Sequence, residues 1–241
     1  MQLIPLILFA PSILLIAAAI IPAAYLLYYV YKMDRLEKEP PKLLLKLVLF
    51  GVLSTIFAEI TEYLGIAGLP YLFEAGSQNY NLALYFIVIG LSEEGFKYLL
   101  LKKSTWRHVE FNCQFDGVVY AVFVSLGFAL WENIAYVLSY GFSTAIARAV
   151  TAVPGHACFG VFMGAFYGAA KRFELSGDYY RSKRTRFLAV VIPMLLHGTY
   201  DYFASSQEEY GAIAFIIFVV IMFIFAHSLV KELSNKDRYI A

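Results

Sequence analysis

The chain has 241 residues, of which 61% are hydrophobic, and its mean hydropathy is +0.67. One soluble core could not bury this much apolar material, so the composition excludes an ordinary soluble protein and predicts a polytopic membrane protein. The net charge is +1, and the basic residues are spread over short loops, so no nucleic-acid partner is expected.

Seven apolar stretches recur along the chain, and each is close to the ~20 residues that a helix needs to cross a bilayer. The first lacks a basic leader and a clear cleavage site, so it predicts a retained span and not a signal peptide. We expect one membrane-embedded domain, 1–241, an all-α bundle with its catalytic core at about 81–205. The expected spans are about 3–31, 43–61, 81–101, 115–139, 149–170, 187–205 and 211–230.

Basic residues predict the orientation of the bundle, because cytoplasmic loops are enriched in Lys and Arg. All of them except Lys97 and Arg148 follow spans one, three, five and seven. The N-terminus is therefore expected outside and the C-terminus inside, in a multi-pass protein of the cell membrane. The charged connector 32–41 ends in two prolines, and it is expected to be a solvated interfacial hinge.

Span three carries two adjacent acids, Glu93 and Glu94, followed by Lys97 one turn later. An ionisable residue at bilayer depth costs roughly 2.5–3.5 kcal/mol, so such a pair persists where protein or trapped water surrounds it. We expect one carboxylate to pair with Lys97 while the other stays free. A purely structural Glu–Lys pair would explain Glu93 but would leave Glu94 without a role.

Spans four to six carry further polar groups at helical spacing. Glu132 shares a stripe with Phe128 and Tyr136, and Glu132 and Asn133 could serve chemistry or only join helices by hydrogen bonds. His156 heads a seam of glycines at every fourth residue, which predicts close packing against another helix. His197 and Asp201 lie one turn apart, a spacing that suits two metal ligands or a histidine oriented by its carboxylate.

Acids and imidazoles from four spans therefore predict one polar pocket inside the bilayer. Its simplest chemistry is the activation of water, by a carboxylate base alone or with a Zn²⁺ ion. We expect Glu93 and Glu94 to supply the base, and His156 and His197, with Glu132 or Asp201, to hold zinc or stabilise the oxyanion. Arg148 could orient the peptide or balance Glu132, or it could be an ordinary outer-end charge. Glu59 and Glu62 are expected to be interfacial or paired with Arg148.

Six segments of the chain form a recognisable set of motifs: Glu93-Glu94-Gly-Phe-Lys97, Phe115 to Tyr120, Leu126 to Tyr136, Arg148 to His156 and Leu196 to Asp201, with Asp34 to Pro40 in addition. Together these motifs resemble the PrsW family of intramembrane proteases. The family is similar to type II CAAX prenyl endopeptidases and related bacterial membrane proteases. Their Phe-x-x-x-His motif reads Phe128-x-x-x-Glu132 here, and His156 supplies an imidazole instead.

The resemblance implies an intramembrane endopeptidase that acts on membrane-associated proteins or peptides, with site-1 cleavage of an anti-sigma factor as the associated role. Within the wider superfamily, a metal-dependent mechanism and a metal-free glutamate mechanism have both been proposed. Two other functions are compatible with the polar spans, namely an ion- or proton-coupled transporter and a non-catalytic membrane scaffold. The oligomeric state is open.

Overall fold

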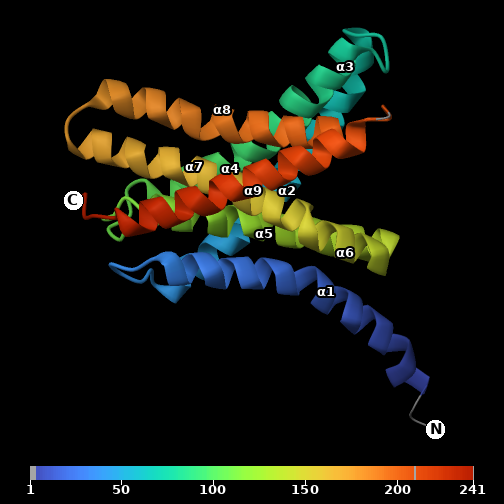
Figure 1. The fold of residues 1–241 in the computed structure, drawn as a ribbon, viewed down its shortest axis with the longest axis horizontal. Coiled ribbons are helices and arrows are strands. Elements are labelled where there is room, and N and C mark those ends of the chain that lie inside the picture. The colour runs from blue at the N-terminus through green and yellow to red at the C-terminus, as the bar shows by residue number, and fades with distance from the viewer. Residues whose placement is uncertain (1–3, 209, 241) are drawn as a thin grey trace.

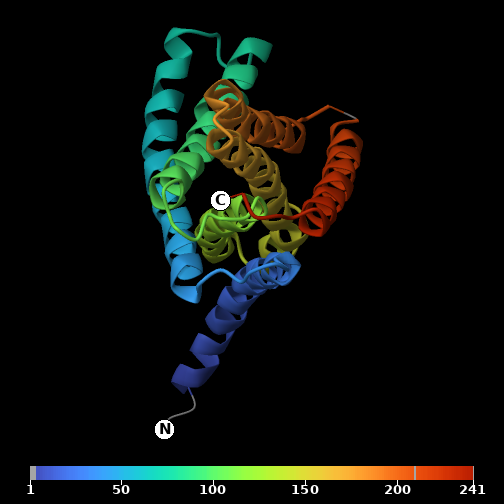
Figure 2. The same cartoon turned by 90° about the vertical axis from the view of Figure 1, so that its left-hand side faces the viewer.

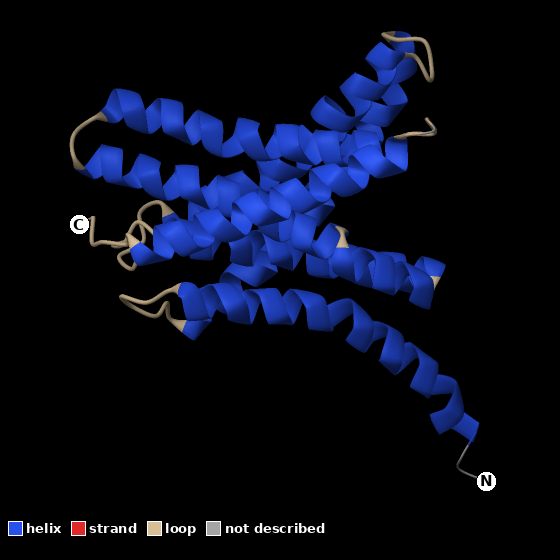
Figure 3. Ribbon diagram, viewed as in Figure 1, coloured by secondary structure: helices blue, strands red, loops and turns tan. Residues whose placement is uncertain are grey.

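The computed structural model describes residues 4–208 and 210–240, and these form helices joined by loops, without a strand (Figure 3). The all-α prediction is therefore confirmed. The elements are α1 (Ile4–Met33), α2 (Pro41–Gly68), the 3₁₀ turn η1 (Leu69–Tyr71), α3 (Gln78–Leu82), the π-helix η2 (Ala83–Leu91), α4 (Ser92–Thr105), α5 (Asp116–Tyr140), α6 (Phe142–Val150), α7 (Ala152–Leu175), α8 (Tyr179–Ala204) and α9 (Gly211–Asn235).

Among the described residues, six helical segments are long and apolar enough to cross a membrane. They are Leu15–Met33, Pro41–Tyr71, Asp116–Tyr140, Phe142–Leu175, Tyr179–Ala204 and Gly211–Asn235. The stretch expected as span three differs, because it is divided among α3, η2 and α4, and α4 carries Glu93, Glu94 and Lys97. The protein is a multi-pass helical membrane protein.

The central helix of the bundle is α5, which packs against α1, α2, α4 and α7. Residues 116–129 of α5 are buried on every side, as expected for a helix that is surrounded by others. Figure 1 shows α1 along one edge of the bundle and the α7–α8 pair along the opposite edge. Figure 2 shows that the N-terminal part of α1 leaves the bundle.

Glycines allow α5 to approach both of its main partners at backbone distance. On the α2 side, a Cβ atom at Gly127 would lie 2.2 Å from the Val48 carbonyl oxygen. On the α7 side, a Cβ atom at Gly164 would lie 2.5 Å from the Gly117 carbonyl oxygen, and one at Gly168 would lie 2.1 Å from that of Gln114. The predicted glycine seam below His156 is thus confirmed as a close helix contact.

The connector between α1 and α2 is less solvated than its charge predicts. Asp34 is 1% exposed and Glu39 is 3% exposed, and neither carboxyl oxygen of Asp34 has a hydrogen-bond partner among the described residues. The C-terminal segment packs nearby, because Asp237 accepts a hydrogen bond from the Phe115 amide and Ile240 donates to the Asn112 carbonyl. Charge alone predicted a hinge in water, whereas tertiary packing buries two of its acids.

Gly127→Ala is expected to destabilise the protein, because the new methyl group would collide with the backbone of α2. Overpacking of this kind typically costs about 1–3 kcal/mol. Unfolding of the detergent-solubilised protein checks this, with Gly68→Ala as the control, since a Cβ atom at Gly68 meets no atom within 4 Å. Equal stability of the two variants would contradict the close α2–α5 contact.

The buried connector also predicts a pH dependence of stability. Burial raises the pKa of Asp34 from 3.8 to about 6 and the pKa of Glu39 from 4.5 to about 7. Both acids bind protons more tightly in the folded protein, so their stabilising contribution is complete below about pH 4 and is lost as the pH rises through 6–7. Glu39→Gln should therefore make the fall in melting temperature between pH 5 and pH 8 shallower than in the wild type.

The matched control is Glu74→Gln, which removes an exposed carboxylate. That variant should keep the slope of the wild type. A Glu39→Gln protein with the full wild-type slope would show that Glu39 does not hold its proton in the folded state.

Candidate active site

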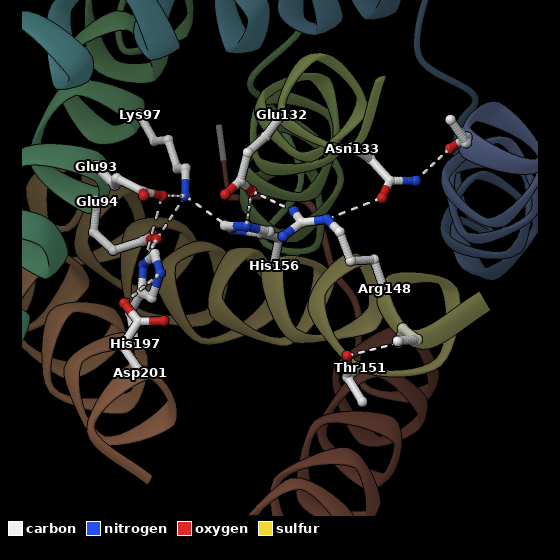
Figure 4. A network of polar contacts seen from close by, with 12 residues as sticks. Glu93, Glu94, Lys97, Glu132, Asn133, Arg148, Thr151, His156, His197 and Asp201 are labelled. Carbon is white, nitrogen blue, oxygen red and sulfur yellow. Dashed lines mark hydrogen bonds and ion pairs between the residues drawn. The ribbon is translucent and has the colours of Figure 1, made fainter. Parts of the chain in front are cut away.

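The ammonium group of Lys97 lies at the centre of a buried polar network (Figure 4). Its Nζ donates to Glu94 Oε1 at 2.7 Å and to Glu93 Oε2 at 3.2 Å, and it lies 3.1 Å from Nδ1 of His156. Phe128 covers the ammonium group, with its ring centroid 3.9 Å from Nζ. The expectation that one glutamate stays free of Lys97 is wrong, because the long lysine side chain reaches both the i−3 and the i−4 carboxylate.

His197 connects α8 to the same acids. Its Nδ1 lies 3.0 Å from Glu94 Oε1 and 3.8 Å from Glu93 Oε2. Its Nε2 lies 3.4 Å from the carboxylate of Asp201 one turn later, as the spacing predicted. Phe159 stacks on the imidazole with ring centroids 4.7 Å apart. The ring is therefore oriented by a carboxylate on each side and by an aromatic face.

His156 connects α7 to a second chain of polar contacts. Its Nε2 lies 2.9 Å from Glu132 Oε2, which also accepts a hydrogen bond from Arg148 at 2.8 Å. Arg148 in turn donates to Asn133 Oδ1 at 3.0 Å, and the Asn133 amide donates to the Ala19 carbonyl of α1 at 2.8 Å. Arg148 thus balances Glu132, one of the roles expected for it. The chain links four helices, α1, α5, α6 and α7.

The two histidines contact each other edge to face, and both line the same cavity. Their ring centroids are 5.3 Å apart, and the cavity has a volume of about 370 Å³. Glu93 borders it as well, whereas Glu94 and Lys97 lie behind the wall and are fully buried. Glu93 is therefore the member of the glutamate pair that meets the contents of the cavity. The lining residues are Glu62, Tyr85, Ile89, Glu93, Glu132, Tyr136, Arg148, Ala152, His156, Phe159, His197, Tyr200, Asp201, Ala204 and Ser205.

Glu62 of α2 lines this cavity, whereas the sequence predicts that it lies at the membrane interface or pairs with Arg148. Arg148 binds Glu132 instead, and Glu62 Oε1 is buried without a hydrogen-bond partner among the described residues. A sequence signal for this position exists. The buried stripe of α2 runs through Gly51, Thr55 and Ala58, and Glu62 continues it at the same helical spacing.

Two departures from regular α-helix position the site. The π-helix η2 leads directly into α4, two residues before Glu93. π-Helical stretches are rare in proteins, and where they occur they are often at functional sites. Thr151, with φ −122° and ψ −72°, separates α6 from α7, so Arg148 and His156 lie on different helices and not on one straight span. Neither feature follows from hydropathy, which predicts a continuous helix in both segments.

One group of side chains in the described structure can hold a metal ion. Ligand atoms of Glu93, Glu94, His156 and His197 all lie within 4.8 Å of one another, and all four residues are buried. Glu132 and Asp201, expected as carboxylate ligands, contact the Nε2 atoms of the two histidines from outside this group. Five carboxyl groups line or adjoin the cavity, together with two permanent cations, Lys97 and Arg148.

Comparison with known proteins supports this chemistry. The family profile described as "PrsW family intramembrane metalloprotease" matches residues 39–227. The chain is 36% identical to Protease PrsW of Geobacillus kaustophilus, with 82% of each chain covered. It is 34% identical to Protease PrsW of Shouchella clausii, covering 92% of this chain and 97% of the relative, and 34% identical to that of Bacillus subtilis, covering 85% and 90%. No solved structure matches the chain.

The family match extends over most of the bundle and includes every residue of the buried network except Ala19. An enzyme that cuts peptides inside a membrane needs a polar cavity enclosed by helices, and the cavity lined by the two histidines meets that need. The chain belongs to the PrsW family of intramembrane metalloproteases.

Proposed function

We propose that this protease hydrolyses peptide bonds of membrane-associated proteins with Glu93 as the general base. The observation that carries the proposal is that Glu93 borders the cavity that His156 and His197 also line, whereas Glu94 is buried behind it. A base must lie within hydrogen-bond reach of the water that it deprotonates, and Glu93 is the member of the pair that meets this condition.

In this mechanism a water molecule in the cavity gives a proton to the Glu93 carboxylate, and its oxygen attacks the carbonyl carbon of the peptide. The bond from carbon to nitrogen then breaks, and Glu93 passes its proton to the departing amine. Lys97 keeps Glu93 and Glu94 in place through its two ion pairs. Asp201 orients His197, and Glu132, itself held by Arg148, orients His156.

The residues present fit a Zn²⁺ ion. Two imidazoles and a carboxylate are a common catalytic zinc set, and Glu94 Oε2 is a buried carboxylate oxygen without a hydrogen-bond partner among the described residues. His156, His197 and Glu94 would hold the ion, which leaves Glu93 free to act as the base. When bound, zinc would polarise the peptide carbonyl and lower the pKa of water. Lys97 contacts Glu93, Glu94 and His156, so binding requires it to give up at least one contact.

The proposed setting is the cytoplasmic membrane of a bacterium, with the C-terminus inside and the catalytic core at about 81–205. The bacterial origin of the relatives and the distribution of basic residues support this placement. The resemblance to PrsW supports a narrower substrate class, an anti-sigma factor cut at its first site.

Glu93→Gln is expected to reduce cleavage of a fluorogenic membrane-segment substrate by about 10²–10⁴-fold, the usual contribution of a general base. The amide keeps the shape of the side chain but cannot accept the proton. Glu59→Gln is the matched control, because Glu59 is an exposed glutamate of α2 outside the cavity, and it should retain activity. A folded Glu93→Gln protein with wild-type turnover would exclude Glu93 as the base.

The purified wild-type protein is expected to contain stoichiometric zinc, measured by elemental mass spectrometry. His156→Ala should lose the metal, because one nitrogen ligand disappears. His227→Ala should retain it, since this exposed histidine of α9 is hydrogen-bonded to Tyr29 far from the cavity. A fully active preparation without zinc, or retention of the metal by His156→Ala, would refute this ligand assignment.

A further inference from the structure

A second cavity, of about 550 Å³, lies at the other end of α4 from the glutamate pair. Lys102 and Lys103 line it from the last turn of α4, Arg107 from the turn after α4, and Arg186 from α8. Leu99, Trp106 and Glu174 complete its lining. Figure 2 looks onto this end of the bundle, where α7 leads into α8. We propose that this cavity binds the phosphate headgroup of an anionic phospholipid.

The cavity has an excess of positive charge, with four cationic side chains and one acid. None of its four cationic side chains forms an ion pair within the described part of the chain. The one acid present, Glu174, accepts a hydrogen bond from the Trp106 indole at 3.0 Å. Like charges that converge on one cavity repel one another, and a bound phosphate relieves that repulsion through charge-assisted hydrogen bonds.

Ordinary helix electrostatics explains only part of this arrangement. Lys102 and Lys103 lie in the last turn of α4, where the helix dipole favours cations. Arg186 lies in the first third of α8, toward the positive end of that helix dipole, where it gains no such support. Its guanidinium group is instead held over the Trp106 ring, 5.0 Å from the centroid. Packing thus directs Arg186 toward the same cavity as the lysines of α4.

The surroundings of the cavity fit a lipid better than a soluble anion. Leu99 is 56% exposed on its wall, and Phe187, next to Arg186, is 66% exposed. The position of Trp106 is fixed by a hydrogen bond, because Lys171 donates to its carbonyl oxygen at 2.8 Å. An apolar surface that leads to a basic cavity beside a tryptophan matches the boundary between acyl chains and headgroups. A phospholipid would occupy both, with its phosphate in the basic cavity and its acyl chains along the apolar surface.

Quenching of Trp106 fluorescence by brominated lipids tests the proposal. Trp131→Phe leaves Trp106 as the one tryptophan, since the chain contains two. In vesicles we expect brominated phosphatidylglycerol to be preferred over brominated phosphatidylcholine by about tenfold at this residue. Lys102→Gln with Arg186→Gln should abolish the preference. Lys42→Gln with Lys46→Gln removes the same charge from exposed positions outside the cavity and should keep it.

Each other outcome overturns the proposal. Equal loss in both double variants would mean general attraction between a basic surface and an anionic membrane. A retained preference after Lys102→Gln and Arg186→Gln would place the anionic lipid elsewhere. Inorganic phosphate can be added to the phosphatidylcholine vesicles before phosphatidylglycerol is titrated in. If it removes the preference of the cavity for phosphatidylglycerol, the cavity selects a free anion. Competition by an acidic peptide would assign it to a protein segment instead.

Discussion

The organisation of this protease depends on one buried ammonium group, that of Lys97, and on the neighbouring groups that balance its charge. Lys97 has no exposed surface, and an ammonium group away from water is tolerated where opposite charges and hydrogen bonds surround it. Glu93, Glu94 and His156 provide those partners, and through them Lys97 joins α4 to α7. Loss of one partner of such a buried pair typically costs about 3–5 kcal/mol, because the remaining charge stays buried. The arrangement that holds the acids in place is therefore also a condition for folding.

The close contacts of α5 bring the two halves of this network together. Gly127 lets α2 approach α5, and Gly164 and Gly168 let α5 approach α7. Glu132 of α5 can then reach His156 of α7 at hydrogen-bond distance. Without a strong hydrophobic drive between helices in lipid, small residues that permit backbone contact decide which helices meet. The glycines of the seam thus position the polar side chains of the site, although they make none of these polar contacts themselves.

Much of this could be predicted from the sequence because a bilayer restricts the possible structures. Apolar length predicted the helices, and rare polar residues within them predicted the site, as His197 with Asp201 and Glu132 with His156 illustrate. What failed depends on side-chain reach, tertiary packing and local backbone angles. The contact of Lys97 with both acids follows from the reach of one side chain, the burial of Asp34 and Glu39 from neighbours distant in sequence, and the break at Thr151 from backbone angles. Glu62 could have been found, since it extends a buried stripe.

The π-helix η2 has a consequence for how this chain tolerates change. Its hydrogen bonds reach one residue further back than those of an α-helix, so nine residues make fewer turns than usual before Glu93. Removing a single residue there would change the rotation of everything that follows relative to α8, and so move the acid pair relative to His197. Small insertions and deletions that a surface loop absorbs easily would, in this stretch, change how Glu93 and Glu94 lie relative to His197 without replacing any of the three.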